Sequence, residues 1–213
     1  FIKNKQWALA IDAASQTACY REDLIGSYPL NWNALIGLAK NNRVLWPLKP
    51  VHAISSFYSI YNNLTEELIP EQKKFINKEF GIKTLTMMKE VSNELIKDCF
   101  TMDPIQTAEL MTETNDFYYC PYIYGFSNYS RKNYRKNILK YIDVMNLSGK
   151  GPAGTHLGGT GIAVSNVSKN KDLAVEYAFW VAGADCQKSL FYESGGQPGN
   201  SEAWEDEKIN LET

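Results

Sequence analysis

The segment from Asp116 to Arg131 constrains the fold most, because it places five tyrosines between residues 117 and 129. Pro121 and Gly125 interrupt it, and each marks a point where the backbone turns or closely approaches another group. A buried strand is built mainly from Val and Ile, whereas tyrosine offers a flat apolar ring with a hydroxyl at its rim. This combination suits a sugar, whose C–H faces stack on rings and whose hydroxyls bond to phenols and amides. The segment predicts either such a surface or an amphipathic edge strand with aromatic packing.

Within this segment, Tyr122 and Tyr124 are predicted to stack on a ligand, and Asn128 is predicted to bond to its hydroxyls. Two alternatives remain open. Glu113 and Asp116 could serve as the paired carboxylates of a carbohydrate-cleaving enzyme, although no nucleophile motif accompanies them. A tyrosine-rich surface could also bind a partner protein, because aromatic residues dominate protein interfaces.

The composition is typical of a soluble globular protein and does not indicate a polyanion as partner. Of the 213 residues, 44% are hydrophobic and 22% charged, and the net charge is −2. Binding phosphates requires clustered cations, so nucleic acid is not predicted as a partner, and the local cluster Arg131, Lys132, Arg135 and Lys136 is interpreted as a solvated helix face. The sequence contains no run of about eighteen apolar residues, so no membrane-spanning segment is predicted. The four cysteines lack Cys-x-x-Cys spacing, and neither a metal site nor a cofactor is predicted.

The first half of the chain supplies four further candidate residues. An apolar run over residues 7–11 predicts a strand that ends at Asp12, whose carboxylate could bind hydroxyls or only cap the next turn. Trp46 lies in a predicted strand interrupted by prolines, and its ring could stack on a ligand or belong to the core. Lys49 and His52 precede a helix predicted from about residue 53 to 63, where unpaired N–H groups could face a polar ligand. The alternative for His52 is a cap or surface position.

The second half alternates helical patterns with a glycine-rich stretch. Helices are predicted over residues 80–100, 104–111 and 170–181, and a strand over residues 138–145. Six glycines fall between residues 149 and 161, followed by an apolar strand predicted over residues 162–165. They do not form a phosphate loop, because no Gly-Lys-Ser/Thr and helix follow. We interpret them as a flexible loop in which Gly159 and Thr160 approach a ligand, or as a plain turn.

Several motifs, taken together and in order, resemble a known family. They are Leu9 to Asp12, Tyr20-Arg21-x-Asp23-Leu24, Pro29 to Trp32, Gly158 to Ser165, Lys169 to Val181, Gln187 and Gly195-Gly196-Gln197-Pro198. This arrangement is similar to the family 1 extracellular solute-binding proteins, the carbohydrate-binding subunits of bacterial ABC importers. In that family, two crossover segments connect two lobes, and a sugar binds in the cleft between them.

The resemblance implies an α/β fold of the periplasmic-binding-protein-like (type II) sandwich class, with most of one lobe and part of the second. Residues 1–14 would be a crossover strand and the end of the first lobe, residues 15–157 the second lobe, and residues 158–213 the crossover strand and returning helices. The family has about ninety further residues before Phe1 and about a hundred after Thr213, so the chain is expected to be a fragment.

The resemblance also implies a function. It implies a non-catalytic receptor, periplasmic or extracellular, that closes on a small-molecule sugar and docks on the membrane permease subunits of an ABC importer. The residues predicted to bind the ligand are Asp12, Trp46, Lys49, His52, Tyr122, Tyr124, Asn128, Gly159 and Thr160.

Overall fold

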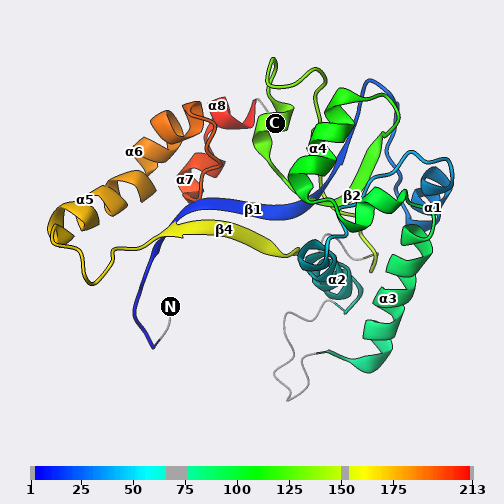
Figure 1. Ribbon diagram of the computed structural model, residues 1–213, viewed down its shortest axis with the longest axis horizontal. Coiled ribbons are helices and arrows are strands. Elements are labelled where there is room, and N and C mark those ends of the chain that lie inside the picture. The colour runs from blue at the N-terminus through cyan, green and yellow to red at the C-terminus, as the bar shows by residue number, and fades with distance from the viewer. Residues whose placement is uncertain (1–2, 66–75, 150–153, 212–213) are drawn as a thin grey trace. The chain divides into compact units, whose positions relative to one another are not determined.

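The computed structural model describes residues 3–65, 76–149 and 154–211, and the chain divides into two compact units (Figure 1). Unit 1 contains residues 1–14, 126–128 and 157–213, and unit 2 contains residues 15–125 and 129–156. One strand, β1 (Leu9–Tyr20), contributes residues to both units. Each unit is described in turn below.

Within its described residues, unit 2 combines an antiparallel sheet with four α-helices. The strands β2 (Tyr119–Tyr124) and β3 (Lys140–Ile142) pair with the second half of β1, on either side of it. The helical elements are α1 (Trp32–Lys40), α2 (Pro50–Thr65), α3 (Lys78–Ser92), α4 (Pro104–Glu113) and the 3₁₀ turns η1 (Lys97–Phe100) and η2 (Ser127–Ser130), of which η2 begins in unit 1.

Local sequence signals explain where the helices of unit 2 begin. The side chain of Asn31 accepts a hydrogen bond from the backbone N–H of Ala34 and so caps α1. At α4, Asp103 and Gln106 form a reciprocal capping box, and Pro104 occupies the first turn, where no N–H is needed. These caps satisfy backbone donors that have no partner within the helix.

The core of unit 2 forms where the sheet meets α1, α2 and α3. Trp46 lies at its centre, with its ring stacked on Tyr122 at 5.7 Å and its indole N–H donated to the Ser56 hydroxyl at 3.1 Å. Both rings are almost completely buried, at 0% and 1% exposure for Trp46 and Tyr122. The other buried members are Ala18, Leu35, Ala39, Val44, Leu48, Ile60, Val91, Tyr119, Val144 and Met145.

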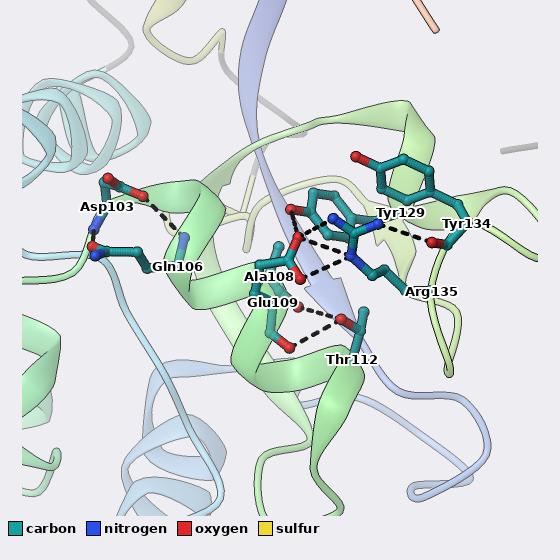
Figure 2. A network of polar contacts seen from close by, with 8 residues as sticks. All are labelled: Asp103, Gln106, Ala108, Glu109, Thr112, Tyr129, Tyr134 and Arg135. Atoms are coloured by element: carbon teal, nitrogen blue, oxygen red, sulfur yellow. Dashed lines mark hydrogen bonds and ion pairs between the residues drawn. The ribbon is translucent and has the colours of Figure 1, made fainter.

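A polar cluster fastens the segment after η2 to α4, as Figure 2 shows. The guanidinium of Arg135 binds both carboxylate oxygens of Glu109, and the hydroxyl of Tyr129 donates to Glu109 Oε1 at 2.7 Å. The same guanidinium lies 4.3 Å from the centre of the Tyr134 ring. Hydrogen bonds from Arg135 and Tyr129 lower the pKa of Glu109, with the Arg135 bonds the larger cause. Glu109 of α4 therefore neutralises the charge of Arg135, one of the four cations in the basic cluster at residues 131–136.

Unit 1 is a smaller assembly in which β4 (Leu157–Ile162) pairs with β1, and Figure 1 shows the two strands side by side. The helices that follow are α5 (Lys171–Ala182), α6 (Ala184–Cys186) with a π-helical turn η3 (Gln187–Phe191), α7 (Ser201–Trp204) and α8 (Glu207–Asn210). A small core unites Tyr192, Ala203 and Ile209. Several large apolar residues of α5 remain exposed, among them Leu173 at 67% and Phe179 at 63%.

Three sequence predictions of secondary structure were wrong. The first strand does not end at Asp12 but continues to Tyr20, because Ala14, Gln16 and Ala18 alternate inward although the polar run Ser15 to Thr17 interrupts the apolar pattern. The helix predicted over residues 80–100 ends at Ser92, where Asn93 caps the last carbonyls. The last part of the glycine-rich stretch, from residue 157, forms strand β4, and residues 163–165 lie beyond its end. Residues 150–153 of that stretch lie outside the described residues.

Candidate functional site

Tyr124, the last residue of β2, lies at the centre of a polar cluster in unit 2. Its hydroxyl lies 2.5 Å from Nδ1 of His156 and 3.3 Å from the hydroxyl of Ser55. With Nδ1 protonated, His156 donates to the Tyr124 oxygen, which in turn donates to Ser55. The ring of Tyr58 stacks on His156 at 6.3 Å with an interplanar angle of 21°. Tyr124, Tyr58 and His156 are all partly exposed, so a ligand can reach them.

His52 approaches the same tyrosine from the first turn of α2. Its ring centre lies 6.3 Å from that of Tyr124, in an edge-on arrangement. Its Nδ1 is buried and has no hydrogen-bond partner among the described residues. Desolvation lowers the pKa of His52, the charge of Asp103 raises it, and Lys49 lowers it. The imidazole is therefore biased toward its neutral form, which can donate and accept hydrogen bonds.

A buried amide, that of Gln16, holds this cluster in place. Gln16 is 2% exposed, accepts a hydrogen bond from Ser59 at 2.6 Å, and donates to Ser56 at 3.2 Å. Ser56 and Ser59 lie on the face of α2 that also carries His52 and Ser55, since residues three, four and seven apart share a helix face.

The chain segment that carries His156 is bound to the same network. The backbone N–H of His156 donates to the Ser59 hydroxyl at 2.9 Å, and its carbonyl accepts from the N–H of Gln16 at 3.1 Å. The hydroxyl of Thr155 donates to the carbonyl of Gln16 at 2.7 Å. Five hydrogen bonds, from side chain or backbone, thus join α2, the start of unit 2 and its end, and they fix where the His156 ring projects.

Unit 1 contributes a second group of predicted residues, around Asp12. Asp12 forms a bridge with Pro198, and the carboxylate has no described hydrogen bond or ion pair within the ranges the structure covers. Desolvation raises its pKa. Gly159 has φ +155°, and a Cβ there would collide with the carbonyl oxygen of Asp12. A glycine is therefore required for β4 to lie this close to β1.

Asn128 and Thr160 complete this group. The Asn128 amide donates to the Gly195 carbonyl at 3.0 Å, and Gly195 itself has φ +88°. The Gln197 side chain donates to the Ala13 carbonyl at 3.0 Å, so the Gly-Gly-Gln-Pro turn is bound to β1 next to Asp12. Thr160 is exposed.

The remaining predicted residues are Trp46, Tyr122 and Lys49. Trp46 and Tyr122 lie in the core of unit 2, where neither presents an open ring face, whereas Lys49 is exposed immediately before α2. The structure thus brings Tyr124 and His52 together in unit 2 and places Gly159 against Asp12 in unit 1. The prediction that all nine line one cleft stays a prediction.

The sequence did not indicate four of the residues that build the cluster: His156, Gln16, Ser55 and Ser59. His156 falls inside the glycine-rich stretch, where the glycines dominate the pattern. One signal was present, because the chain contains two histidines in all and both contact Tyr124. The buried face of α2 carried a second signal, namely serines spaced by one helical turn.

A separate pocket of about 240 Å³ lies in unit 1 and is lined mainly by apolar side chains of β4, α5 and the segment before β1, including Trp7, Val175 and Phe179. It contains none of the nine predicted residues, and its wall lacks the charged and hydroxyl groups that orient a polar ligand. We therefore place the candidate ligand-binding residues in two separate groups, around Tyr124 in unit 2 and around Asp12 in unit 1, and not at this pocket.

Two further properties bear on function. Among the described helices, each is too short or too polar to cross a bilayer. Within the same residues, no three His, Cys, Asp or Glu side chains gather closely enough to hold a metal ion.

No protein-family model matches the sequence, and no curated protein matches it. Solved structures do match over almost the whole chain. A maltose-bound MalE3 of T. maritima superposes with a TM-score of 0.83 at 14% identity, covering 100% of this chain and 59% of that one. An ABC transporter solute-binding protein of Agrobacterium vitis S4, with bound D-mannitol, gives 0.78 at 15% identity, covering 99% and 56%.

A third structure belongs to the same type of protein. The maltose-maltodextrin binding protein of Alicyclobacillus acidocaldarius gives a TM-score of 0.74 at 11% identity, covering 99% of this chain and 58% of that one. The chain therefore spans less than two thirds of the length of these proteins. At such identities the likeness shows the fold alone, and it confirms the predicted class: an α/β fold of the type II periplasmic-binding-protein-like kind, present in part.

Proposed function

We propose that the chain is part of a carbohydrate receptor of a bacterial ABC importer, within the family 1 extracellular solute-binding proteins. The observation that carries this proposal is the fold, because the chain aligns along its length with solute-binding proteins whose structures contain maltose or D-mannitol. The receptor binds a sugar and releases it unchanged. It acts in the periplasm or outside the cell, and in its closed form it docks on membrane permease subunits.

The side chains clustered around Tyr124 are suited to binding a polar, hydroxyl-rich ligand. Tyr58, Tyr124 and His156 present ring edges and faces beside hydrogen-bonding groups, which is the combination a sugar needs. His52 offers a neutral imidazole, and Lys49 offers a cation at the start of the same helix. We assign ligand contacts to Tyr124, His52 and Lys49, and add His156 to them.

In unit 1, Asp12 has the chemistry to accept hydrogen bonds from sugar hydroxyls, because its carboxylate lacks a described partner. Asn128, Thr160 and the backbone of Gly159 are proposed to contribute further polar contacts. Trp46 and Tyr122 are buried, and we propose that they support Tyr124 by filling the core behind β2. Residues 1–14 and 158–213 are proposed to belong to one lobe and residues 15–157 to the other.

The sequence also allows a carbohydrate-cleaving enzyme or a protein-interaction surface, and no contact in the structure supports either function. Glu113 and Asp116 are both exposed, and Asp116 lies 4.0 Å from Arg43, so neither occupies the apolar environment expected of a catalytic acid. An interaction surface made from Tyr122 and Tyr124 would require an accessible Tyr122 ring, and this ring is 1% exposed.

Thermal shift with a panel of sugars tests the proposal, on the protein at its natural length. Maltose, maltotriose and D-mannitol are suitable first probes, with an inorganic salt at equal concentration as the blank. We expect at least one sugar to raise Tm in a saturable manner, because a ligand that binds only the folded state stabilises it by RT ln(1 + [L]/Kd). Tryptophan fluorescence should saturate in parallel, without product formation.

Two outcomes would contradict the proposal. If no mono- or oligosaccharide shifts Tm, carbohydrate recognition is wrong. If an aryl glycoside is hydrolysed and the activity disappears in Glu113→Gln or Asp116→Asn, the chain is a carbohydrate-cleaving enzyme instead.

A further inference from the structure

Two cysteines that are far apart in the sequence face each other across the sheet of unit 2. Cys19 of β1 and Cys120 of β2 are Cα partners in the antiparallel pairing, in register with the next pair, Tyr20 with Tyr119, and just after a register shift between Thr17 and Cys19. Directly opposite residues of such a ladder point to the same face, and their Cα atoms lie about 4.5–5.5 Å apart. This separation falls within the range of about 4.4–6.8 Å that a disulfide spans.

Both thiols are enclosed by the protein, and each makes only a weak contact with another group. Both residues are 0% exposed, and the Cys19 thiol contacts the sulfur of Met111 on α4 at 3.9 Å. The Cys120 thiol makes a weak 3.7 Å contact with the carbonyl of Tyr122. Cys99 lies in η1 and Cys186 in unit 1, and neither is a ladder partner of another cysteine within the described strands.

We propose that Cys19 and Cys120 are a disulfide site, occupied when the protein folds in an oxidising compartment. The oxidant is the disulfide of a thiol–disulfide oxidoreductase. One cysteine thiolate attacks it to form a mixed disulfide, and the second thiolate then displaces the oxidant as a dithiol. The two cysteines lose two electrons and two protons, and the oxidant gains two electrons and takes up two protons. The compartment follows from the proposed extracellular location, whereas the pairing depends only on the fold.

The burial of both thiols sets when the bond forms. An enzyme cannot reach side chains that are fully enclosed, so exchange takes place while β1 and β2 are still pairing or during transient opening. Once formed, the bond is protected from reduction by the same burial. It closes a loop from residue 19 to residue 120, which includes α1, α2, α3 and α4. Long loops of this kind lose much conformational entropy in the unfolded chain when they are cross-linked.

Thiol counting and peptide mapping test the site. The protein is refolded with oxidised and reduced glutathione, denatured, alkylated with iodoacetamide and digested. We expect two of the four cysteines to be alkylated and a linked peptide pair containing Cys19 and Cys120. Tm should be roughly 5–15 °C higher than after treatment with dithiothreitol.

Variants provide the matched comparison. Cys99→Ser and Cys186→Ser should retain the linked peptide pair, whereas Cys19→Ser and Cys120→Ser should remove it. If a variant fails to fold, the mapping of the unchanged protein still decides. Four alkylated cysteines after oxidative refolding, or a link that involves Cys99 or Cys186, would overturn the proposal. Since no sugar enters this experiment, its result is separate from the test of the proposed function.

Discussion

The hydroxyl of Tyr124 lies 2.5 Å from Nδ1 of His156, although the two residues are 32 positions apart in the chain. Tyr124 ends β2, and His156 ends the segment of unit 2 that leads into β4. The contact therefore joins a partly exposed strand end to the point where the chain leaves unit 2. Because this hydrogen bond fixes both rings, it would define the geometry that the proposed sugar ligand meets at this surface.

Replacement of Tyr124 by Phe should weaken sugar binding more than it weakens the fold. The variant keeps the ring but loses the hydrogen bonds to His156 and Ser55. We expect affinity to fall roughly fivefold to thirtyfold, equivalent to about 1–2 kcal/mol, with a Tm decrease of a few degrees at most. Titration calorimetry and thermal unfolding measure the two quantities. Tyr134→Phe is the control, since Tyr134 lies in the cluster on α4, and an equal loss of affinity there would contradict the assignment.

Replacement of Gln16 by Met should destabilise unit 2, because Met has a similar shape but no hydrogen-bonding amide. The change leaves buried hydroxyls of Ser56 and Ser59 without their Gln16 partner. We expect the free energy of unfolding to fall by about 2–4 kcal/mol, measured by urea denaturation.

Gln106→Met is the matched comparison for this change. Gln106 is exposed and loses only one bond of the capping box, so a decrease of about 1 kcal/mol or less is expected. Similar losses in both variants would mean that the buried network contributes nothing beyond an ordinary cap.

Stability should depend on pH through His52. Its pKa is lowered in the folded protein, mainly by desolvation, so the unfolded chain binds the proton more readily. The unfolded state then carries more protons just below its ordinary pKa of about 6.5, and the free energy of unfolding falls as pH is lowered through that value. Urea denaturation between pH 5 and 8 measures this slope. His52→Asn should show a shallower slope than the unchanged protein over this range, and an identical slope would exclude the effect.

Replacement of Gly159 by Ala should disrupt unit 1. The residue has φ +155°, and the added Cβ would collide with the Asp12 carbonyl. We expect a loss of about 2 kcal/mol or more in the free energy of unfolding, because both the backbone conformation and the strand contact oppose a side chain. Gly154→Ala is the control, since no atom lies within 4 Å of the position that its added Cβ would occupy, and a change within about 0.5 kcal/mol is expected there.

Much of the helical structure could be predicted from local sequence. Asn31 and Asp103 cap helices where their side chains can satisfy free N–H groups, and this chemistry acts over three residues. The strands were harder to locate. In the second half of β1, the buried face includes the polar Gln16 beside Ala18, and Ser15 and Thr17 flank it, so the apolar alternation typical of a strand is interrupted. The glycines of β4 resemble a loop in composition, and only their pairing with β1 makes them a strand.

The sequence by itself determined the residue types of the candidate site and the places where several helices begin. Only the tertiary structure decided which of the two tyrosines of β2, Tyr122 or Tyr124, is accessible to a ligand. Tyr122 and Tyr124 are two residues apart and share a strand face, yet Trp46 covers the first, while the second lies at the strand end beside His156. Burial depends on what packs against a residue from elsewhere in the chain, and such contacts between distant segments leave no local trace in the sequence.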